Sequence, residues 1–526
     1  MSVLIRRVVI DNVWPPPERT DSLREHQVDL RIVGDRIREI APRLRQRRGD
    51  DVVDGHGGTV LPGFHDHHVH LRAWSTAAAS VHAGPPEVHT AADLQRRLRS
   101  APGQPGSWVR AIGYHESVAG QLDRARLDRL MPDRPLRVQH RTGALWTLNS
   151  KALEALGLAT AVAADQVPGS SAGTPKPVAL PSGIEFDAAG HATGRFWRVD
   201  QWLHLRLDQI GVTHNLDLAT ISRQAASFGV TGFTDATPDL DAGSVAALSD
   251  AQRAGEILQR LHLMAGLDPN DDPAPAMASP DPSWSGPQAD DRRSVENEPG
   301  ALVSTGPAKV LLDDDHLPSF DTLVTMFRAA HARRRPVAVH CVTRTQSALT
   351  VSALAEAGTV PGDRMEHGAI LGSDLLPALH ALGITVVTQP GFVRERGDRY
   401  LSDVERDDHC DLWRLASLLD SGVRTALSSD APFGPDDPWA VIDAATSRRT
   451  VEGRLLGPAE RISTRRAVDL FCGWPERPDI RRQIALEAPA DLMVLARTLD
   501  DGLADGSPMV LATVVGGSVV HRGDAE

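Results

Sequence analysis

Residues 59–71 read TVLPGFHDHHVHL, and this stretch decides the fold of the chain. Its apolar first half predicts a buried strand that ends in His68 and His70. Side chains two residues apart on a strand point to the same face, so we expect these two imidazoles to leave the strand side by side. Paired histidines at a strand end form one half of many metal sites. His65 and His67 form a competing pair on the opposite face, but the apolar lead-in of PGFxDxHxH favours His68 and His70.

The composition is typical of a soluble globular enzyme. The 526 residues are enough to bury a large core, and 41% are hydrophobic and 24% charged. A net charge of −13 argues against a nucleic-acid partner, because phosphate contacts need a basic face. The N-terminal residues lack the continuous apolar run of a signal peptide, and nothing reaches the length of a membrane span. We therefore expect a cytoplasmic protein with a small-molecule substrate and no membrane partner; a homodimer is compatible with these features.

Lysine is rare in this chain, and one lysine lies in a strand-like context. Of the 56 basic residues only Lys151, Lys176 and Lys309 are lysines. A lysine amine can lose its proton when buried, which a guanidinium cannot do. Lys151 and Lys176 stand in polar surroundings, whereas Lys309 stands inside AKVLLDDD. Lys309 is therefore a candidate functional residue.

Strand-like and helical stretches alternate through the middle of the chain. Near-continuous apolar strands separated by helical periodicity are typical of a parallel sheet. Eight such repeats predict a (β/α)8 TIM barrel, whose active site lies at the carboxyl ends of its strands. The expected strands are 59–70, 230–236, 259–266, 308–313, 335–341, 364–368, 384–389 and 423–430.

The remaining segments predict the domain organisation. Residues 1–58 and 485–526 alternate apolar and polar residues between turns, which predicts one composite β-sandwich built from both termini. Residues 59–71 are expected to be the first barrel strand, and 215–484 the rest of the barrel. Residues 72–214 break the alternation and predict an inserted α+β subdomain over the barrel mouth. Within the barrel, 268–300 are rich in Pro, Asp and Ser and predict a flexible loop.

Polar residues recur at the expected carboxyl ends of the barrel strands. Each of them alone is compatible with an ordinary core or loop residue, but together they put four imidazoles, an amine and a carboxylate at one face. Burying such groups is costly, and a bound metal ion offsets that cost. The residues are His68, His70, Lys309, His340, His367 and Asp430.

These motifs resemble the amidohydrolase superfamily, and within it the amidohydrolase 3 branch, which includes N-substituted formamide deformylases. The supporting stretches include LNSKALEALG, GIEFDAAGHATGR, RMEHGAIL, TQP and SSDAP. The resemblance implies that His68, His70 and Asp430 hold one divalent ion and that His340 and His367 hold a second. It also implies that Lys309, carboxylated by CO2, bridges them as a carbamate. Zinc suits such ligands best, with one or two ions bound.

The implied reaction is hydrolysis of a non-peptide C–N bond, in an amide, an N-formyl or N-acyl group or a cyclic amide, by a metal-activated water. Asp430 would then act as the catalytic base, with Lys309 as the second catalytic residue. The same metal site acting on an ester, a carbamate or an aromatic amine is the alternative. A barrel that binds a small molecule or metal without turnover is a third interpretation.

The chain departs from the family pattern around the expected pocket. Ala144 stands near the place of an expected histidine, CVTRTQ follows His340, and GFVRERG follows TQP. These differences predict a substrate other than that of the known deformylases.

Four residues are candidate substrate contacts, each with a structural alternative. Tyr114 and His115 follow an apolar strand and would stabilise negative charge on the substrate, or else hydrogen-bond at the strand end. Trp146 would form an apolar pocket wall, or else belong to the core. Arg394 would bind a carboxylate, or else lie on an exposed loop.

Overall fold

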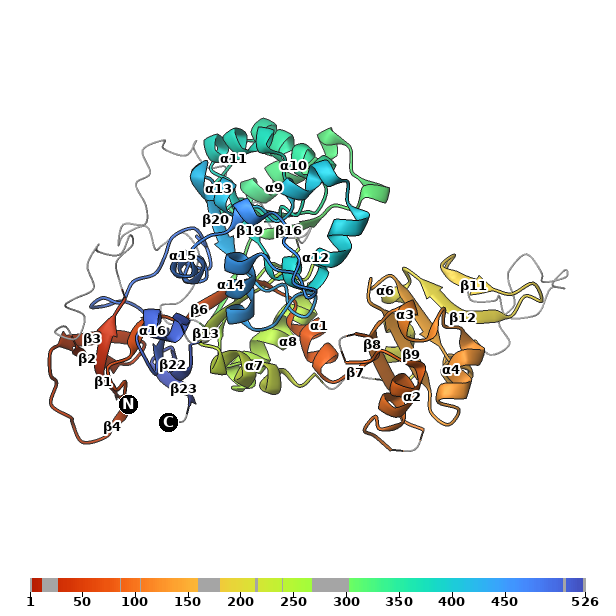
Figure 1. Ribbon diagram of the computed structural model, residues 1–526, viewed down its shortest axis with the longest axis horizontal. Coiled ribbons are helices and arrows are strands. Elements are labelled where there is room, and N and C mark those ends of the chain that lie inside the picture. Colours follow the sequence, from red (N-terminus) through yellow and green to blue (C-terminus); the bar gives the residue numbers. More distant parts are fainter. Residues whose placement is uncertain are drawn as a thin grey trace. The chain divides into compact units, whose positions relative to one another are not determined.

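The computed structural model describes residues 2–11, 27–85, 87–104, 106–158, 180–212, 216–238, 240–266, 302–504 and 508–523. The chain divides into two compact units (Figure 1). The larger unit comprises Met1–Trp74 and Leu218–Glu526, and the inserted unit comprises Ser75–Asp217. The loop predicted for 268–300 lies outside the described residues. The helices of the described chain are all too short or too polar to cross a lipid bilayer.

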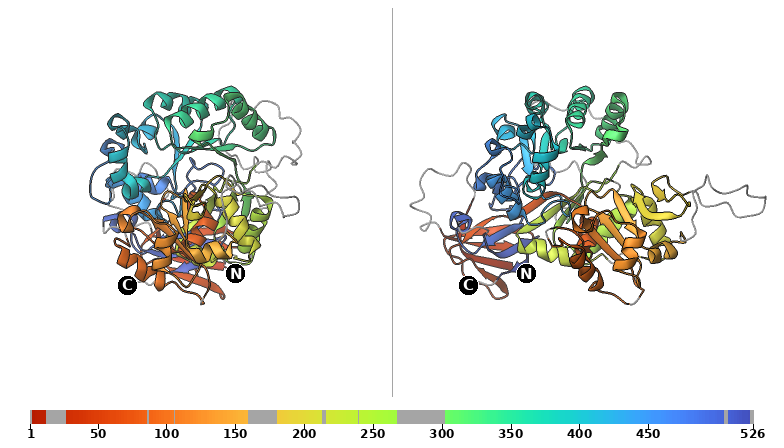
Figure 2. Two further views of the ribbon diagram at one scale, coloured as in Figure 1. Left: turned by 90° about the vertical axis from the view of Figure 1, so that its right-hand side faces the viewer. Right: turned by 45° about the vertical axis from the view of Figure 1, so that its right-hand side comes forward.

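Strands from both ends of the chain form one sheet in the larger unit. Its order is β23-β22-β21-β5-β1-β2-β3, with β4 beside β1, so the first strands (red) and the last strands (blue) lie together (Figure 1, Figure 2). The eight strands are connected into one sheet, whereas the sequence predicted a β-sandwich. The strands are β1 (Ser2–Ile10), β2 (Val28–Val33), β3 (Arg36–Ala41), β4 (Asp50–Asp54), β5 (Thr59–Pro62), β21 (Leu492–Leu495), β22 (Val510–Val515) and β23 (Ser518–Arg522).

The stretch 59–71 contains two strands and not the single barrel strand that was predicted. Residues of β5 pair with β1 and β21 in the terminal sheet. The chain leaves that sheet at Gly63, and β6 (Phe64–Val69) pairs with β13 (Val230–Asp235). A side chain at residue 63 would place its Cβ 2.1 Å from the Thr231 side chain. The close approach of β13 therefore requires glycine at this crossing, which the apolar pattern alone does not reveal.

Two parallel sheets make up the rest of the larger unit. One has the order β15-β14-β13-β6 and the other β16-β17-β18-β19-β20. Each of the eight expected strand segments contains a strand, and β15 is an additional one. The architecture is thus mixed α/β with parallel strands, and in the described residues strand pairing does not join the two sheets into a closed barrel. The strands not yet bounded are β14 (Arg260–Leu263), β15 (Val303–Thr305), β16 (Ala308–Leu311), β17 (Val337–Cys341), β18 (Arg364–His367), β19 (Thr385–Thr388) and β20 (Arg424–Leu427).

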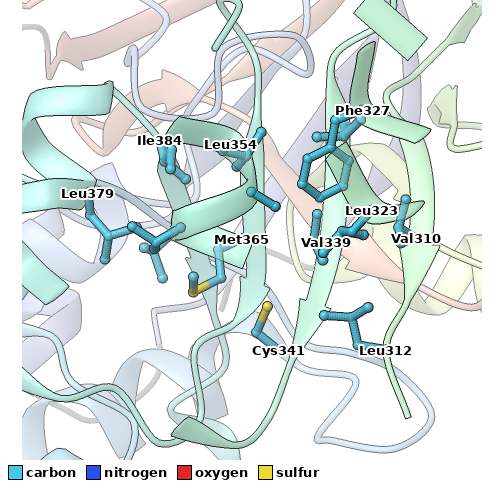
Figure 3. Packing of buried hydrophobic residues seen from close by; sticks show 14 of the residues in the cluster. Val310, Leu312, Leu323, Phe327, Val339, Cys341, Leu354, Met365, Leu379 and Ile384 are labelled. Atoms are coloured by element: carbon cyan, nitrogen blue, oxygen red, sulfur yellow. The ribbon is translucent and has the colours of Figure 1, made fainter. Parts of the chain in front are cut away.

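Helices follow most of these strands and bury one apolar face against them. In α9 (Phe320–Ala332) the Ser319 side chain caps the first turn, and Leu323, Phe327 and Ala330 are buried at helical spacing. Their side chains pack with those of Val310 and Val339 from the strands (Figure 3). The other helices of the larger unit are α1 (Leu71–Ala78, which runs into the inserted unit), α7 (Leu218–Ser227), α8 (Ala242–Arg253), α10 (Arg344–Ala357), α11 (Leu376–Leu382), α12 (Gly391–Asp403), α13 (Ala416–Asp420), α14 (Pro438–Ser447), α15 (Thr464–Asp469) and α16 (Leu499–Ala504).

The inserted unit has its own sheet and its own core. The strand order is β11-β12-β10-β9-β8-β7, parallel from β7 to β9 and antiparallel beyond. Its strands are β7 (Val81–His82), β8 (Val109–Tyr114), β9 (Leu136–His140), β10 (Leu145–Leu148), β11 (Ile184–Phe186) and β12 (Ala192–Trp197). Its helices are α2 (Ala91–Arg99), α3 (Glu116–Ala119), α4 (Arg124–Leu130), α5 (Ser150–Ala155) and α6 (Asp200–Gln209).

Candidate metal centre

The parallel strands of the larger unit carry the six predicted residues, five of them near or just beyond the carboxyl ends. His68 lies near the end of β6 with His70 just beyond it, and His367 is the last residue of β18. Lys309 is in β16, His340 in β17, and Asp430 follows β20. These six residues are called the candidate centre below. Carboxyl ends of neighbouring parallel strands meet at one edge, which explains how residues far apart in sequence come together.

His68, His367 and Asp430 form the tightest group of the candidate centre. One donor atom from each lies within 4.8 Å of the others. Asp430 Oδ1 is 3.2 Å from His70 Nε2 and 3.7 Å from His68 Nε2. The ring centroids of His340 and His367 are 4.5 Å apart. His367 thus lies close to His68 and Asp430 and also to His340, and the division of these ligands between one or two ions stays a prediction.

The competing pair His65 and His67 lies elsewhere. Both are buried, and His65 Nε2 is hydrogen-bonded to Thr234 Oγ1 at 2.8 Å. Neither belongs to the group formed by His68, His367 and Asp430.

Neighbouring side chains fix the ring orientation of two histidines. His68 Nδ1 is hydrogen-bonded to Glu366. His367 Nδ1 donates to Gln389 Oε1 at 2.8 Å, and Gln389 in turn donates through Nε2 to Ser428 Oγ at 2.8 Å. An imidazole that donates through Nδ1 keeps the lone pair of Nε2 free for a metal ion. Sequence reasoning assigned no role to Glu366 or Gln389, although both stand in the quoted motifs RMEHG and TQP.

Among the described residues, three buried donor atoms of the candidate centre have no partner in hydrogen-bonding geometry. They are His68 Nε2, Lys309 Nζ and Asp430 Oδ1. Leaving such atoms unsatisfied is costly in a protein interior. Imidazole nitrogen and carboxylate oxygen are ligands that suit a divalent cation such as zinc. The residues present therefore fit a metal ion.

Burial lowers the pKa of four basic groups of the candidate centre. It lowers the pKa of His68 and of His367 well below the usual range, and that of His340 to about 4. The pKa of Lys309 is also lowered, since burial outweighs the opposing effect of Glu366 and Asp430. Neutral imidazoles are the form that binds metal ions.

The backbone at two of these residues is left-handed. The φ angle is 70° at His367 and 59° at Asp430. Such angles are uncommon for residues other than glycine and cluster at functional sites. The Asp430 N–H donates to the His68 carbonyl at 2.9 Å, and the Ser429 N–H donates to Asp66 Oδ1 at 3.0 Å. These bonds fix the segment after β20 against β6.

The four candidate substrate contacts have other partners in the structure. In the inserted unit, the hydroxyl of the buried Tyr114 donates to the Gly120 carbonyl, and His115 Nδ1 accepts from the Ser117 N–H at the start of α3. Trp146 is buried with the guanidinium groups of Arg110 and Arg137 over its ring. In the larger unit, Arg394 is exposed and 3.3 Å from Asp443. These contacts correspond to the structural alternatives for all four residues.

Sequence reasoning assigned no role to Phe433, an aromatic residue beside the candidate centre. Phe433 is 48% exposed, and its ring centroid lies 5.3 Å from that of His70. The Phe433 N–H donates to the Asp430 carbonyl at 2.7 Å, and its carbonyl accepts from Arg396 at 2.8 Å. The backbone N–H and carbonyl of Phe433 are thus both hydrogen-bonded, and its exposed ring lies beside His70.

Buried imidazoles, a carboxylate and a buried lysine amine gather on the parallel strands of an α/β fold, and this arrangement fits a metal-dependent enzyme. The chain belongs to the amidohydrolase family, whose model matches residues 51–521. It is accordingly a hydrolase of the class that acts on carbon–nitrogen bonds.

Two curated proteins and one solved structure are similar over most of their length. The chain is 26% identical to an N-substituted formamide deformylase from Arthrobacter pascens, covering 85% of each. It is 24% identical to the putative amidohydrolase YtcJ from Bacillus subtilis, covering 91% of this chain and 93% of that one. An uncharacterized metal-dependent hydrolase from Pyrococcus horikoshii superposes with a TM-score of 0.65 at 17% identity, covering 94% and 98%. The last likeness shows the fold alone.

Proposed function

We propose that this protein hydrolyses a non-peptide C–N bond of a small molecule at a divalent metal centre. The observation that carries the proposal is the set of buried donor atoms without hydrogen-bond partners on His68, Lys309 and Asp430. The names of the curated relatives, a formamide deformylase and a putative amidohydrolase, support an amide or N-formyl substrate.

His68, His70, His367 and Asp430 would hold the ion, with His340 and Lys309 beside them. A bound divalent ion supplies Lewis acidity and makes water more acidic. Asp430 would accept a proton from the attacking water on a carboxylate oxygen and deliver it to the leaving nitrogen. As water adds to the carbonyl carbon the C–N bond breaks, which yields a carboxylic acid and an amine.

Lys309 is proposed to carry a carbamate. The lowered pKa favours the neutral amine, which can add to CO2 and release one proton. The product is an anion with two oxygen donors next to the imidazoles. Carboxylation would thus give a role to the Nζ atom of Lys309, which has no hydrogen-bond partner among the described residues.

The two parallel sheets are proposed to be the halves of one (β/α)8 barrel, in which β15 and β16 would be two parts of one strand. Thr305, which ends β15, and Ala308, which begins β16, are separated by two residues. At the other edge, the His70 N–H donates to the Ala431 carbonyl at 2.9 Å, which links the segments after β6 and β20. Both edges are therefore adjacent, as closure requires.

Metal analysis combined with a substrate panel tests this function. The purified full-length chain should retain a divalent metal, and it should hydrolyse at least one of the N-formyl, N-acyl or cyclic amides. A chelator should abolish the turnover, and zinc should restore it. A protein that retains no metal and hydrolyses no amide contradicts the proposal. Turnover of esters or aromatic amines alone would assign a different scissile bond to the same site.

A further inference from the structure

Glu366 lies between a histidine of the candidate centre and a buried arginine. One of its carboxylate oxygens is hydrogen-bonded to His68 Nδ1. The carboxylate also accepts from Arg364, through Nε to one oxygen and through Nη2 to the other at 3.2 Å. All three side chains are fully buried. Hydrogen bonds thus link the guanidinium of Arg364 to the carboxylate of Glu366, and that carboxylate to the imidazole of His68.

The left-handed backbone of His367 explains how its ring reaches the same place as the Glu366 side chain. Consecutive residues on a strand normally point to opposite faces. Here Glu366 contacts His68, and the ring of the next residue, His367, also lies 4.8 Å from that of His68. The φ angle of 70° at His367 turns the strand end so that both side chains reach the same place. Backbone strain at this residue thus brings a carboxylate and an imidazole together.

Arg364 holds the Glu366 carboxylate in place inside the protein through hydrogen bonds from its Nε and Nη2 atoms. Arg364 also donates through Nη2 to the His67 carbonyl at 2.5 Å, which ties it to the strand that carries His68. A buried carboxylate held in this way is costly to form and strongly destabilising to disrupt. Such a network is expected where the carboxylate has a role besides packing.

The two histidines that group with Asp430 have different hydrogen-bond partners at Nδ1. His68 donates to a carboxylate, whereas His367 donates to the neutral amide of Gln389. A carboxylate partner raises the basicity of a metal-ligating imidazole more than an amide does, and it fixes the tautomer. His68 Nε2, the opposite ring nitrogen, is the one without a hydrogen-bond partner.

We propose that Arg364 and Glu366 are positioning residues that make His68 the strongest imidazole ligand and set how tightly the metal ion is held. This inference rests on the proposed metal-dependent function. Arg364 and Glu366 would thus help to retain the ion through His68, without contacting the ion themselves.

Zinc affinity and the rate of zinc loss to a chelator test the proposal in the full-length protein. Glu366→Gln should weaken zinc binding by about 10- to 100-fold and speed zinc loss correspondingly, as partner removal does in other zinc sites. Glu366→Asp keeps the charge and should recover part of the affinity. In the double variant Arg364→Met with Glu366→Gln no unpaired charge is buried, so it carries the test if the single variant does not fold.

Glu460 offers a matched control away from the candidate centre. It is a buried glutamate paired with Arg414 at 3.2 Å. Glu460→Gln should lower thermal stability and leave zinc affinity unchanged. If the Glu366 variants retain zinc within about twofold of the parent protein, the pair is merely structural and the inference is overturned. If the parent protein itself binds no zinc, the proposed function fails first, and the two failures are distinguished.

Discussion

At the residue scale, the chemistry of the candidate centre depends on buried donors that the protein leaves without partners. Lys309 is buried, burial lowers the pKa of its amine, and among the described residues Nζ has no hydrogen-bond partner. The carboxylate of Asp430 faces two imidazoles. Groups of this kind are stable together when a cation or a further anion completes the set.

Lys309→Ala should lower the metal content and reduce kcat/KM by about 100-fold or more, because the proposed carbamate beside the ion is lost. Elemental analysis and steady-state kinetics check both effects. Lys151→Ala is a suitable control, since Lys151 is exposed and paired only with Glu154 at 3.0 Å. Unchanged metal content and turnover in Lys309→Ala would reject the assignment of this lysine.

Asp430→Asn should retain metal but lose turnover by about 10²- to 10⁴-fold, because an amide cannot accept the proton of the attacking water. Single-turnover kinetics with parallel metal analysis separates the two properties. Asp443→Asn, at an exposed aspartate paired with Arg394, should change neither. An active Asp430→Asn enzyme would rule out Asp430 as the base.

At the element scale, the chain passes from the terminal sheet to the parallel sheet at a single residue. The strands β5 and β6 are separated by Gly63 alone, and β13 passes so closely that any side chain there meets Thr231. The Thr231 hydroxyl also donates to the Phe64 carbonyl at 3.2 Å. The register of β6, and with it the position of His68, depends on this contact.

Gly63→Ala should therefore lower the free energy of unfolding by about 1–3 kcal/mol through overpacking. Urea denaturation followed by circular dichroism measures the loss. Gly243→Ala is the matched control, because a Cβ at this position in α8 meets nothing closer than 3.6 Å and alanine favours a helix. Equal stability of the two variants would contradict the close approach at Gly63.

At the scale of the whole molecule, the larger unit buries several neutral imidazoles besides those of the candidate centre. Burial lowers the pKa of His262 to about 3 and places those of His65 and His67 well below the usual range. The unfolded chain takes up these protons near the ordinary histidine pKa of about 6.5, so stability is lost as the pH falls below that value. Asp66 acts in the opposite direction, because burial raises its pKa to about 7.

His262→Gln isolates one part of this pH dependence. His262 contributes stability that is present above about pH 6.5 and is lost toward its folded pKa of about 3. The difference amounts to about 2 kcal/mol between pH 7 and pH 5. Denaturation of the metal-free protein at both pH values should show a smaller decrease for His262→Gln than for the parent. Equal decreases would contradict a buried neutral His262.

Much of the architecture was predictable because it depends on local patterns. Apolar runs located all the strands of the two parallel sheets except β15, and alternation located strands at both termini that join in one sheet. The division of 59–71 at Gly63 was not predictable, because it depends on how closely a distant strand approaches. The barrel closure, the homodimer and the position of the inserted unit over the barrel stay predictions.

The same distinction holds within the candidate centre. His68, His367 and Asp430 were predictable as a set because parallel strands bring their carboxyl ends together. Glu366 was not, because alternation on the strand places it on the face opposite His367, and only the left-handed backbone reverses this. The four substrate contacts suggested by the local sequence have partners within the protein, and their role toward a substrate stays a prediction, while Phe433 was found only through its distance to His70.

The sequence by itself thus determined the family, the parallel strands and the residues able to hold a metal, since hydrophobic period and residue chemistry are local properties. Only the tertiary structure decided which of those residues meet, which nitrogen each imidazole presents and which buried charge orients it. Those features depend on distances between segments hundreds of residues apart, and no local pattern encodes them.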